Sequence, residues 1–137
     1  MALTAVLEFG DNSIKRYSKQ YMVADCRMDF VRSYNQSCPE GSARCEKVEV
    51  SVIAPGKGDL SLFEWYADRS MQNGRLLFNL QSDGATEVQN AHILYFEDAQ
   101  CFTLSETYDI DKSRRRLIKL GITANVMEID GISYLRK

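Results

Sequence analysis

The chain has little of several residue types on which common functions depend. Its 137 residues include two prolines, one tryptophan and one histidine, and 19 acidic against 17 basic residues give a net charge of -2. A dedicated nucleic-acid binder would carry a strongly basic balance, which is missing here. Apolar residues make up 45% and charged residues 26% of the chain, a balance that favours a packed core over disorder. We therefore expect residues 1–137 to form a single domain.

Long apolar runs are also missing. Charged residues interrupt every apolar stretch well before the roughly 20 residues that a membrane-spanning helix needs. The N-terminus has no basic region, and Glu8 already interrupts its first apolar stretch, which is unlike a secretory signal peptide. The sequence thus predicts a protein that is made in the cytoplasm and does not insert into a membrane.

The sequence contains none of the common motifs for catalysis or for binding a cofactor or a metal. It has no G-x-G-x-x-G, P-loop or H-E-x-x-H pattern, and no glycine elbow surrounds a serine. His92, the only histidine, is expected to be a strand residue at a surface or interface rather than a catalytic base. We expect no enzymatic activity, no cofactor and no metal site.

The four cysteines lack the spacing of a metal or redox site. Cys26, Cys38, Cys45 and Cys101 form no C-x-x-C pair, and a reducing compartment would keep them as thiols. They are expected to be small buried apolar side chains. A disulfide between Cys38 and Cys45 stays open for a chain that reaches an oxidising space.

What the sequence does contain is alternation of apolar and polar residues with period two, which is typical of strands with one buried face. The second such stretch places Met22, Ala24, Cys26, Met28 and Phe30 on one face. The last inward face is expected to run from Ile118 to Val126. The alternation predicts strands over residues 3–9, 21–32, 48–52, 76–80, 87–103, 118–126, 127–129 and 132–135.

Polar and turn-forming residues separate these strands. Residues 33–43 are predicted to form an exposed loop, and residues 108–116 a polar connection with three consecutive arginines. The dipeptide Asp130-Gly131 is typical of a type I′ hairpin turn.

One helix is predicted in the middle of the chain. Ser61 and Glu64 have the spacing of a capping box, in which each side chain accepts a hydrogen bond from an otherwise unpaired backbone N–H. Leu62 and Trp65 share its apolar stripe, and Asn73-Gly74 is expected to end it. The elements together predict a mainly β fold, a compact β-barrel or sandwich of about seven to nine strands with one inserted helix at about 61–72.

Residues 87–103 are predicted to be apolar on both faces in the middle of their strand. Ile93 and Tyr95 point to one side, and Leu94 and Phe96 point to the other. Two apolar faces need two coverings, of which one is the core and the other is the helix or a neighbouring subunit.

Several segments in order along the chain resemble one known family. The chain is similar to the tube (needle) proteins of type VI secretion systems, the Hcp or TssD family, in the subtype with an S-L-F-E-W helix start and an I-S-A-N-like end. The segments that carry the resemblance are Leu62-Phe63-Glu64-Trp65, Gly74, Leu76-Leu77-Phe78, Glu97-Asp98-Ala99-Gln100-Cys101, Ile122-Thr123-Ala124-Asn125 and Ile129-Asp130-Gly131.

The resemblance implies a β-barrel with a flanking helix that forms hexameric rings without catalytic residues. Such rings stack into a hollow tube, capped by a spike protein, that a contractile sheath drives out of the cell with effector proteins in its lumen. We expect strand 87–103 and loops 33–43 and 54–59 to mediate contacts within and between rings. The candidate contact residues are Ile93, Tyr95, Glu97, Arg114, Arg115, Arg116 and Lys57, and the structural helix residues are Ser61, Leu62, Phe63, Glu64 and Trp65.

A binding module is the alternative hypothesis. A small β-barrel can bind single-stranded nucleic acid through a basic loop and nearby aromatic side chains, and Arg114, Arg115 and Arg116 would supply the charge. On a net-acidic chain a short basic loop is more often solvated or part of a protein interface. Arginines at an interface would form charge-assisted hydrogen bonds with carboxylates of the next ring.

Overall fold

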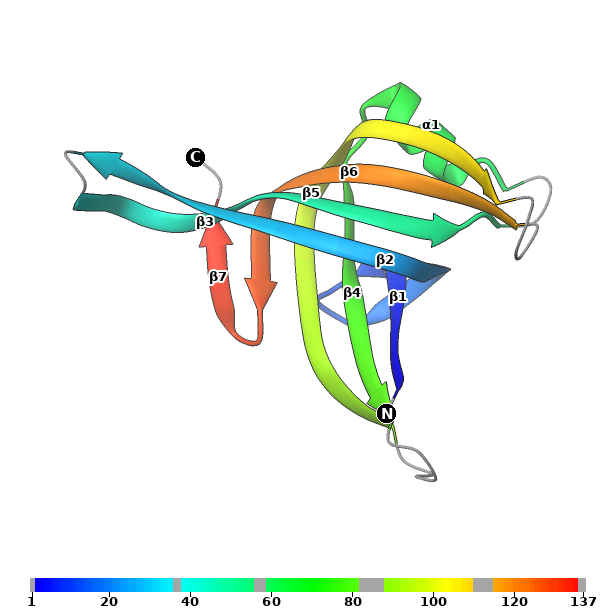
Figure 1. The fold of residues 1–137 in the computed structure, drawn as a ribbon, viewed down its shortest axis with the longest axis horizontal. Helices are drawn as coiled ribbons and strands as arrows, with labels where there is room; N and C mark the ends of the chain where they lie inside the picture. The colour runs from blue at the N-terminus through cyan, green and yellow to red at the C-terminus, as the bar shows by residue number, and fades with distance from the viewer. Residues whose placement is uncertain (1, 36–37, 56–58, 82–87, 110–114, 136–137) are drawn as a thin grey trace.

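A computed structural model shows, in the residues that it describes, seven antiparallel strands and one short helix (Figure 1). The structure describes residues 2–35, 38–55, 59–81, 88–109 and 115–135. The elements are β1 (Ala2–Asp11), β2 (Arg16–Asn35), β3 (Cys38–Ile53), α1 (Ser61–Asp68), β4 (Gln72–Gln81), β5 (Val88–Asp109), β6 (Arg115–Ile129) and β7 (Ile132–Leu135).

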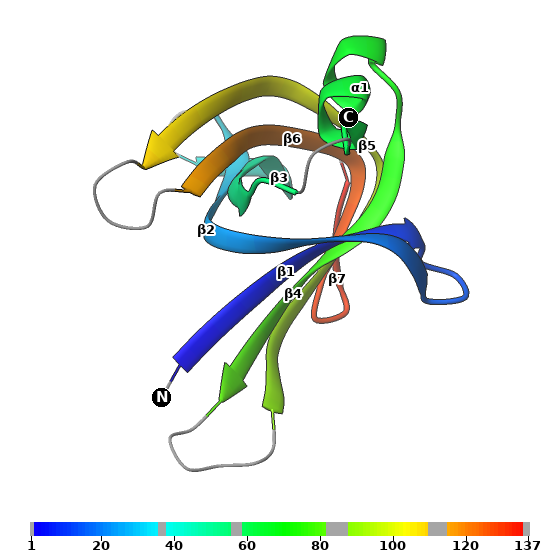
Figure 2. The ribbon, with the colours of Figure 1, turned by 90° about the vertical axis from the view of Figure 1, so that its right-hand side faces the viewer.

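Six of the strands close into a barrel. They follow the order β3-β2-β1-β4-β5-β6, and β3 then pairs with β6 through Val48–Ile53 and Leu117–Ile122. β7 extends the sheet beyond β6, with which it pairs from Val126 to Ile129. Figure 2 shows the curved strands around the enclosed core, with α1 across one end. The predicted mainly β fold is confirmed, with the strand number at the lower end of the predicted range.

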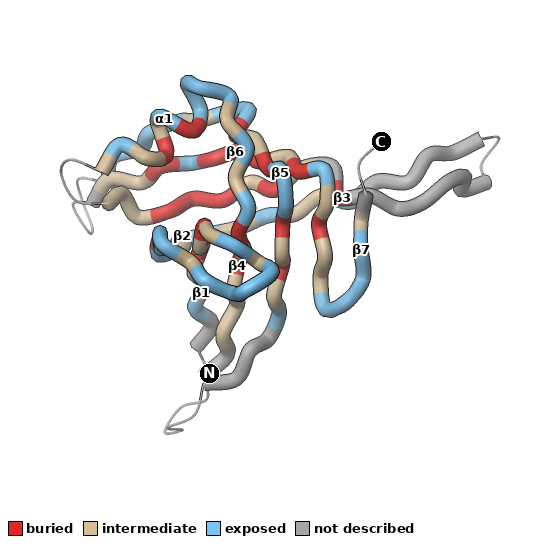
Figure 3. The backbone as a smooth tube through the Cα atoms, turned by 180° about the vertical axis from the view of Figure 1, so that it is seen from behind, coloured by how far each residue is buried: buried red, intermediate tan, exposed pale blue. Residues whose placement is uncertain are grey.

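Inward-facing side chains of the barrel strands form the core. Leu7, Leu76 and Leu94 lie opposite one another on β1, β4 and β5, and none is more than 1% exposed. In Figure 3, buried positions alternate with more exposed ones along these strands. Period-two alternation therefore predicted the inward faces of β1, β3 and β4 correctly. On β3, the inward-facing Val48, Val50 and Val52 are also buried.

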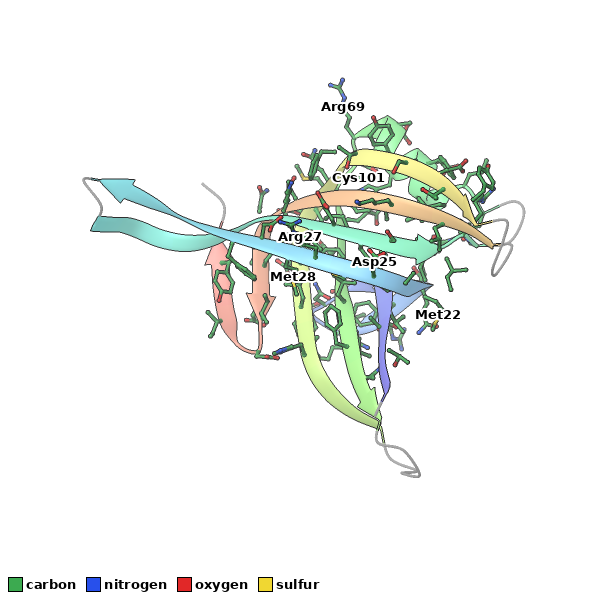
Figure 4. All side chains as sticks on the ribbon, in the orientation of Figure 1. Met22, Asp25, Arg27, Met28, Arg69 and Cys101 are labelled. Atoms are coloured by element: carbon green, nitrogen blue, oxygen red, sulfur yellow. The ribbon has the colours of Figure 1, made fainter. Side chains whose placement is uncertain are left out.

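The inward face predicted for β2 is wrong at its start. Val23 and Asp25 pair with consecutive residues of β3, so Ala24 is an extra residue, a β-bulge. A bulge moves the following side chains to the other face of the strand. Cys26 and Met28 pack against the core as predicted, whereas Met22, labelled in Figure 4, is 51% exposed on the outside of the barrel. The prediction is also wrong for Phe30, which follows a second register shift and is 46% exposed.

A similar change of face occurs where β5 and β6 bend together. Asp98 of β5 has a φ of 53°. On β6, the core-facing side chain after Ala124 is that of Met127, three residues later rather than two. Val126, predicted to face inward, is paired with Glu97 and is half-buried. A side chain displaced by the bend cannot be found by extending a strict alternation.

Two predicted connections are shorter than expected because strands occupy their ends. β2 continues to Asn35 and β3 begins at Cys38, so most of the predicted loop 33–43 is hairpin, with Ser33 opposite Glu40. The predicted connection 108–116 is also partly strand, since Tyr108 pairs with Arg116. The hairpin at Asp130-Gly131 is confirmed, with φ of 50° and 88° between β6 and β7.

The helix begins at Ser61 as predicted but is shorter than predicted, and its start is not capped as expected. It ends at Asp68, because Arg69 adopts a left-handed conformation, and Asn73-Gly74 belongs to β4. No side-chain cap hydrogen bond forms at its start, so the capping box of Ser61 and Glu64 is wrong. Instead, the Oδ1 atom of Asp59 accepts a hydrogen bond from the Ser61 N–H at 3.0 Å.

Candidate functional site

A row of apolar side chains crosses four strands on the outside of the barrel. Met22 of β2 is opposite Val6 of β1, Val6 is opposite Leu77 of β4, and Leu77 is opposite Ile93 of β5. Their sequence neighbours Tyr21, Leu7, Leu76 and Leu94 face the core, so this row faces outward. We call Met22, Val6, Leu77 and Ile93 the apolar row. Contiguous outward apolar residues on a sheet favour burial against another molecule.

A polar row runs beside the apolar row on the same outer face. Glu8, Arg75, Tyr95 and Glu128 lie opposite one another on β1, β4, β5 and β6. The Arg75 Nε atom lies 2.8 Å from the Glu8 Oε1 atom, and the guanidinium lies 4.2 Å above the centre of the Tyr17 ring. These contacts fix Arg75 flat against the sheet.

Glu8 stabilises the charged form of Arg75. Burial opposes the charged guanidinium, but the hydrogen bond and the charge of Glu8 outweigh burial and raise the pKa of Arg75. The cation stays charged and paired on this face, so the polar row is a rigid border of the apolar row.

The candidate contact residues of β5 lie together on this face. Ile93 belongs to the apolar row, Tyr95 to the polar row, and Glu97 follows two residues later and is exposed. Ile93 and Tyr95 are half-buried, while Leu94 and Phe96 are 1% exposed in the core. The strand thus has one face in the core and one that the rest of the chain covers only in part.

The candidate basic residues are separate from the apolar row. Arg116 begins the barrel part of β6, and its Nε atom lies 3.9 Å from the Glu106 Oε1 atom. Arg115 pairs with Asp109 in the strand register. Arg114 and Lys57 lie outside the described residues.

The apolar side chains of the predicted helix residues face the core. Leu62 and Trp65 are each 2% exposed, and Phe63 packs against the core. The Trp65 and Phe9 rings pack edge to face, with 5.1 Å between the ring centres. Ser61 and Glu64 lie on the outer side of the helix start, where Ser61 is half-buried and Glu64 exposed.

The ends of β2 and β3 form an arm. Figure 1 shows them extending away from the barrel, and their pairing continues through Val31 with Arg44 to Asn35 with Cys38. A two-stranded hairpin has little stability by itself in water, so such an arm needs a partner surface. The arm includes most of the segment 33–43 that we predicted to mediate contacts.

Other chemistry-bearing residues do not gather into a site. Among the described residues, no group of three or more His, Cys, Asp or Glu side chains could hold a metal ion. None of the described helices is long and apolar enough to cross a membrane. His92 is exposed, as predicted, and its Nδ1 atom lies 2.5 Å from the Asp130 Oδ2 atom.

The described cysteines are free thiols. Cys45 and Cys101 are buried as predicted and Cys26 is half-buried, and burial raises the pKa of each to about 11. The Cys45 thiol is free, and the side chain of Cys38, the partner in the disulfide that the sequence left open, lies outside the described side chains.

The apolar row was only partly found from the sequence. The sequence predicts a contact role for Ile93 because its strand is apolar on both sides, but it predicts Met22 in the core and no contact role for Val6 or Leu77. One local signal existed in Leu76-Leu77-Phe78, where three apolar residues in succession give β4 an apolar residue on its outer face. Strand order and register were needed to align it with Val6 and Ile93.

Solved structures of the same fold are similar over nearly the whole chain. Hcp1 from Flavobacterium johnsoniae is 14% identical with a TM-score of 0.68, covering 99% of this chain and 100% of that chain. The secreted protein Hcp3 from Pseudomonas aeruginosa is 11% identical with a TM-score of 0.69 and the same coverage. A type six secretion system protein is 13% identical with a TM-score of 0.65, covering 93% and 83% of the two chains. At these identities the similarity establishes the fold.

Sequence comparison establishes the family. No curated protein matches the chain. The profile of the family described as Hemolysin coregulated protein Hcp (TssD), however, matches residues 1–137. The chain therefore belongs to the Hcp (TssD) family, the non-enzymatic tube proteins of type VI secretion systems.

Proposed function

We propose that this chain forms hexameric rings that stack into a hollow tube, which a contractile sheath propels to deliver effector proteins. The apolar row is the observation that carries the proposal. An outward row of Met22, Val6, Leu77 and Ile93 across four strands is buried when barrels pack side by side. Family membership supports the ring and the tube, together with the sheath and spike proteins as partners.

The arm gives the proposed rings a means of stacking. It extends beyond the barrel, so it can reach a neighbouring ring while the apolar row stays within its own ring (Figure 1). Obligate contacts of this kind bury more than about 2,000 Å², enough to transmit axial force without dissociation.

Within the family, we propose that the chain belongs to the subtype whose helix starts with S-L-F-E-W.

Met22→Glu tests the proposal, because Met22 is exposed and its replacement spares the core. We expect the unchanged chain to form six-fold rings in negative-stain images and to sediment as a hexamer. Met22→Glu should shift it toward monomer, since a charge would be buried in the contact. Ile132→Glu, at an equally exposed apolar residue outside the row, is the matched control and should leave the hexamer intact.

A chain that stays monomeric at high concentration, or a Met22→Glu variant that assembles like the control, would contradict this assignment of the ring contact.

A further inference from the structure

A pocket of about 410 Å³ lies between α1 and the neighbouring parts of β1 and β2. Phe9, Tyr21 and Trp65 are among its lining residues, and none of these rings is more than 6% exposed. Polar side chains from β2, α1 and the start of β4 form its rim, among them Lys19, Glu64 and Asp68. An aromatic base with a polar rim is typical of a binding pocket.

The rim of this pocket carries uncompensated negative charge. Lys19 is neutralised by Asp59, whose Oδ1 atom lies 3.9 Å from the Lys19 Nζ atom. Glu64 and Asp68 stand one helical turn apart on α1, and no ion pair to either occurs among the described residues. Like charges at this spacing destabilise a helix, so a cation placed between them is favoured.

The end of the helix adds to this charge. The last turn of α1 contains Asp68 and no basic residue, although the negative end of the helix dipole lies there. Two carboxylates, a helix C-terminus and aromatic rings together match one chemical group, a guanidinium. Its planar face packs on an aromatic ring while its N–H groups donate to carboxylates.

We propose that this pocket receives an arginine from segment 112–116 of a second copy of the chain. The inference rests on the proposed ring and names the charged contact within it. Four of these five residues are basic, more than in any other five-residue stretch of the sequence. Arg116 is already near Glu106 of its own chain, so Arg114 and Arg115 are the donors.

The placement of the two surfaces fits a head-to-tail contact. β5 ends and β6 begins on the left flank of the barrel in Figure 2, while the β1–β2 turn lies on the right flank. The pocket includes Gly10, Ser18 and Lys19 near that turn. Complementary surfaces on different flanks of one subunit generate a closed ring when the rotation per subunit divides a full turn.

A charge-swap experiment tests the contact. The acidic variant Glu64→Gln/Asp68→Asn and the basic variant Arg114→Gln/Arg115→Gln should each raise the dissociation constant of the assembly about tenfold in analytical ultracentrifugation. The variant with all four substitutions should have a dissociation constant little higher than that of either double variant, because the acidic and basic variants remove the same contact. Reversal of both sides, Glu64→Lys/Asp68→Lys with Arg114→Glu/Arg115→Glu, should restore assembly. Asp25→Asn removes an exposed carboxylate of β2 and is the control.

Trp65 provides a direct readout of the pocket, because it is the only tryptophan of the chain. Its fluorescence should change on assembly of the unchanged chain. The change should be smaller in the acidic and basic variants at equal extent of assembly.

The outcomes separate this inference from the ring itself. Rings that form with unchanged affinity and unchanged Trp65 emission in both variants would overturn the arginine contact and leave the proposed function standing. Weakening by the acidic variant alone would overturn segment 112–116 as the occupant. A strictly monomeric chain would overturn both proposals.

Discussion

The Trp65 Nε1 atom donates a hydrogen bond to the backbone oxygen of Ala99 at 3.1 Å, although the two residues are 34 positions apart. Trp65 is 2% exposed and Ala99 is fully buried. The bond joins the only helix among the described residues to β5 and satisfies an indole N–H that has left water. Trp65 therefore both closes one end of the core and fixes α1 against the barrel.

Trp65→Ala should destabilise the folded chain by about 3 to 5 kcal/mol. The substitution leaves a cavity beside Phe9 and removes the hydrogen bond to the Ala99 carbonyl. Urea unfolding followed by circular dichroism measures the loss. Tyr66→Ala, at the exposed neighbour, is the control and should change stability much less. Equal stability of the two variants would refute the role of Trp65 in the core.

Gly74→Ala should destabilise β4 through a direct clash. A Cβ atom at this position would lie 2.1 Å from the Glu8 backbone oxygen, and backbone cannot move aside cheaply. We expect a loss of about 1 to 3 kcal/mol, as for overpacked core positions. Gly131→Ala is a useful contrast, since its Cβ would meet nothing within 4 Å and only its φ of 88° is unfavourable. A smaller effect at Gly74 than at Gly131 in thermal melts would contradict the close approach.

Asp59→Ala should weaken the start of α1 by about 1 kcal/mol, the typical net contribution of one hydrogen bond, because it removes the acceptor of the Ser61 N–H. Hydrogen bonds from Ser61 lower the pKa of Asp59 from its ordinary value of 3.8. The folded state thus favours the carboxylate, which stabilises the protein above the ordinary pKa. This contribution disappears as the pH falls through the lowered pKa of the folded chain. The free energy of unfolding, measured between pH 2 and 7, should depend less on pH in the variant. An unchanged pH profile would exclude the hydrogen bond between Asp59 and Ser61 as a source of stability.

The thiols of Cys26, Cys45 and Cys101 should react slowly with iodoacetamide at pH 8 in the folded protein. Burial raises the pKa of each to about 11, so the reactive thiolate is scarce until the pH approaches that value. Mass spectrometry after labelling with and without urea would count modified cysteines. Rapid labelling of all four in the absence of urea would contradict the buried state of these thiols.

Local patterns were sufficient for most of the strands and for the family. Alternation located the buried valines of β3, and Asp130-Gly131 located the last hairpin. The resemblance to Hcp (TssD) proteins is confirmed by the family match over residues 1–137. These signals lie within a few consecutive residues, so no long-range information was needed to find them.

The corrections concern features that no local pattern encodes. The helix ends at Asp68 because the chain must turn back into β4, although Asn73-Gly74 is the stronger stop signal in the sequence. Segment 33–43 has the composition of a loop but continues the β2–β3 hairpin. Tertiary pairing outweighs local preference in both places.

By itself the sequence determined the barrel strands, the buried face of α1 and the family, since alternation and turn residues act over short distances. Only the tertiary structure decided which apolar residues face outward, because the bulge at Ala24 turns Met22 away from the core. Strand register then aligns Met22 with Val6, Leu77 and Ile93. The outer face that we propose for assembly therefore depends on pairings between residues up to 71 positions apart, and no local periodicity specifies them.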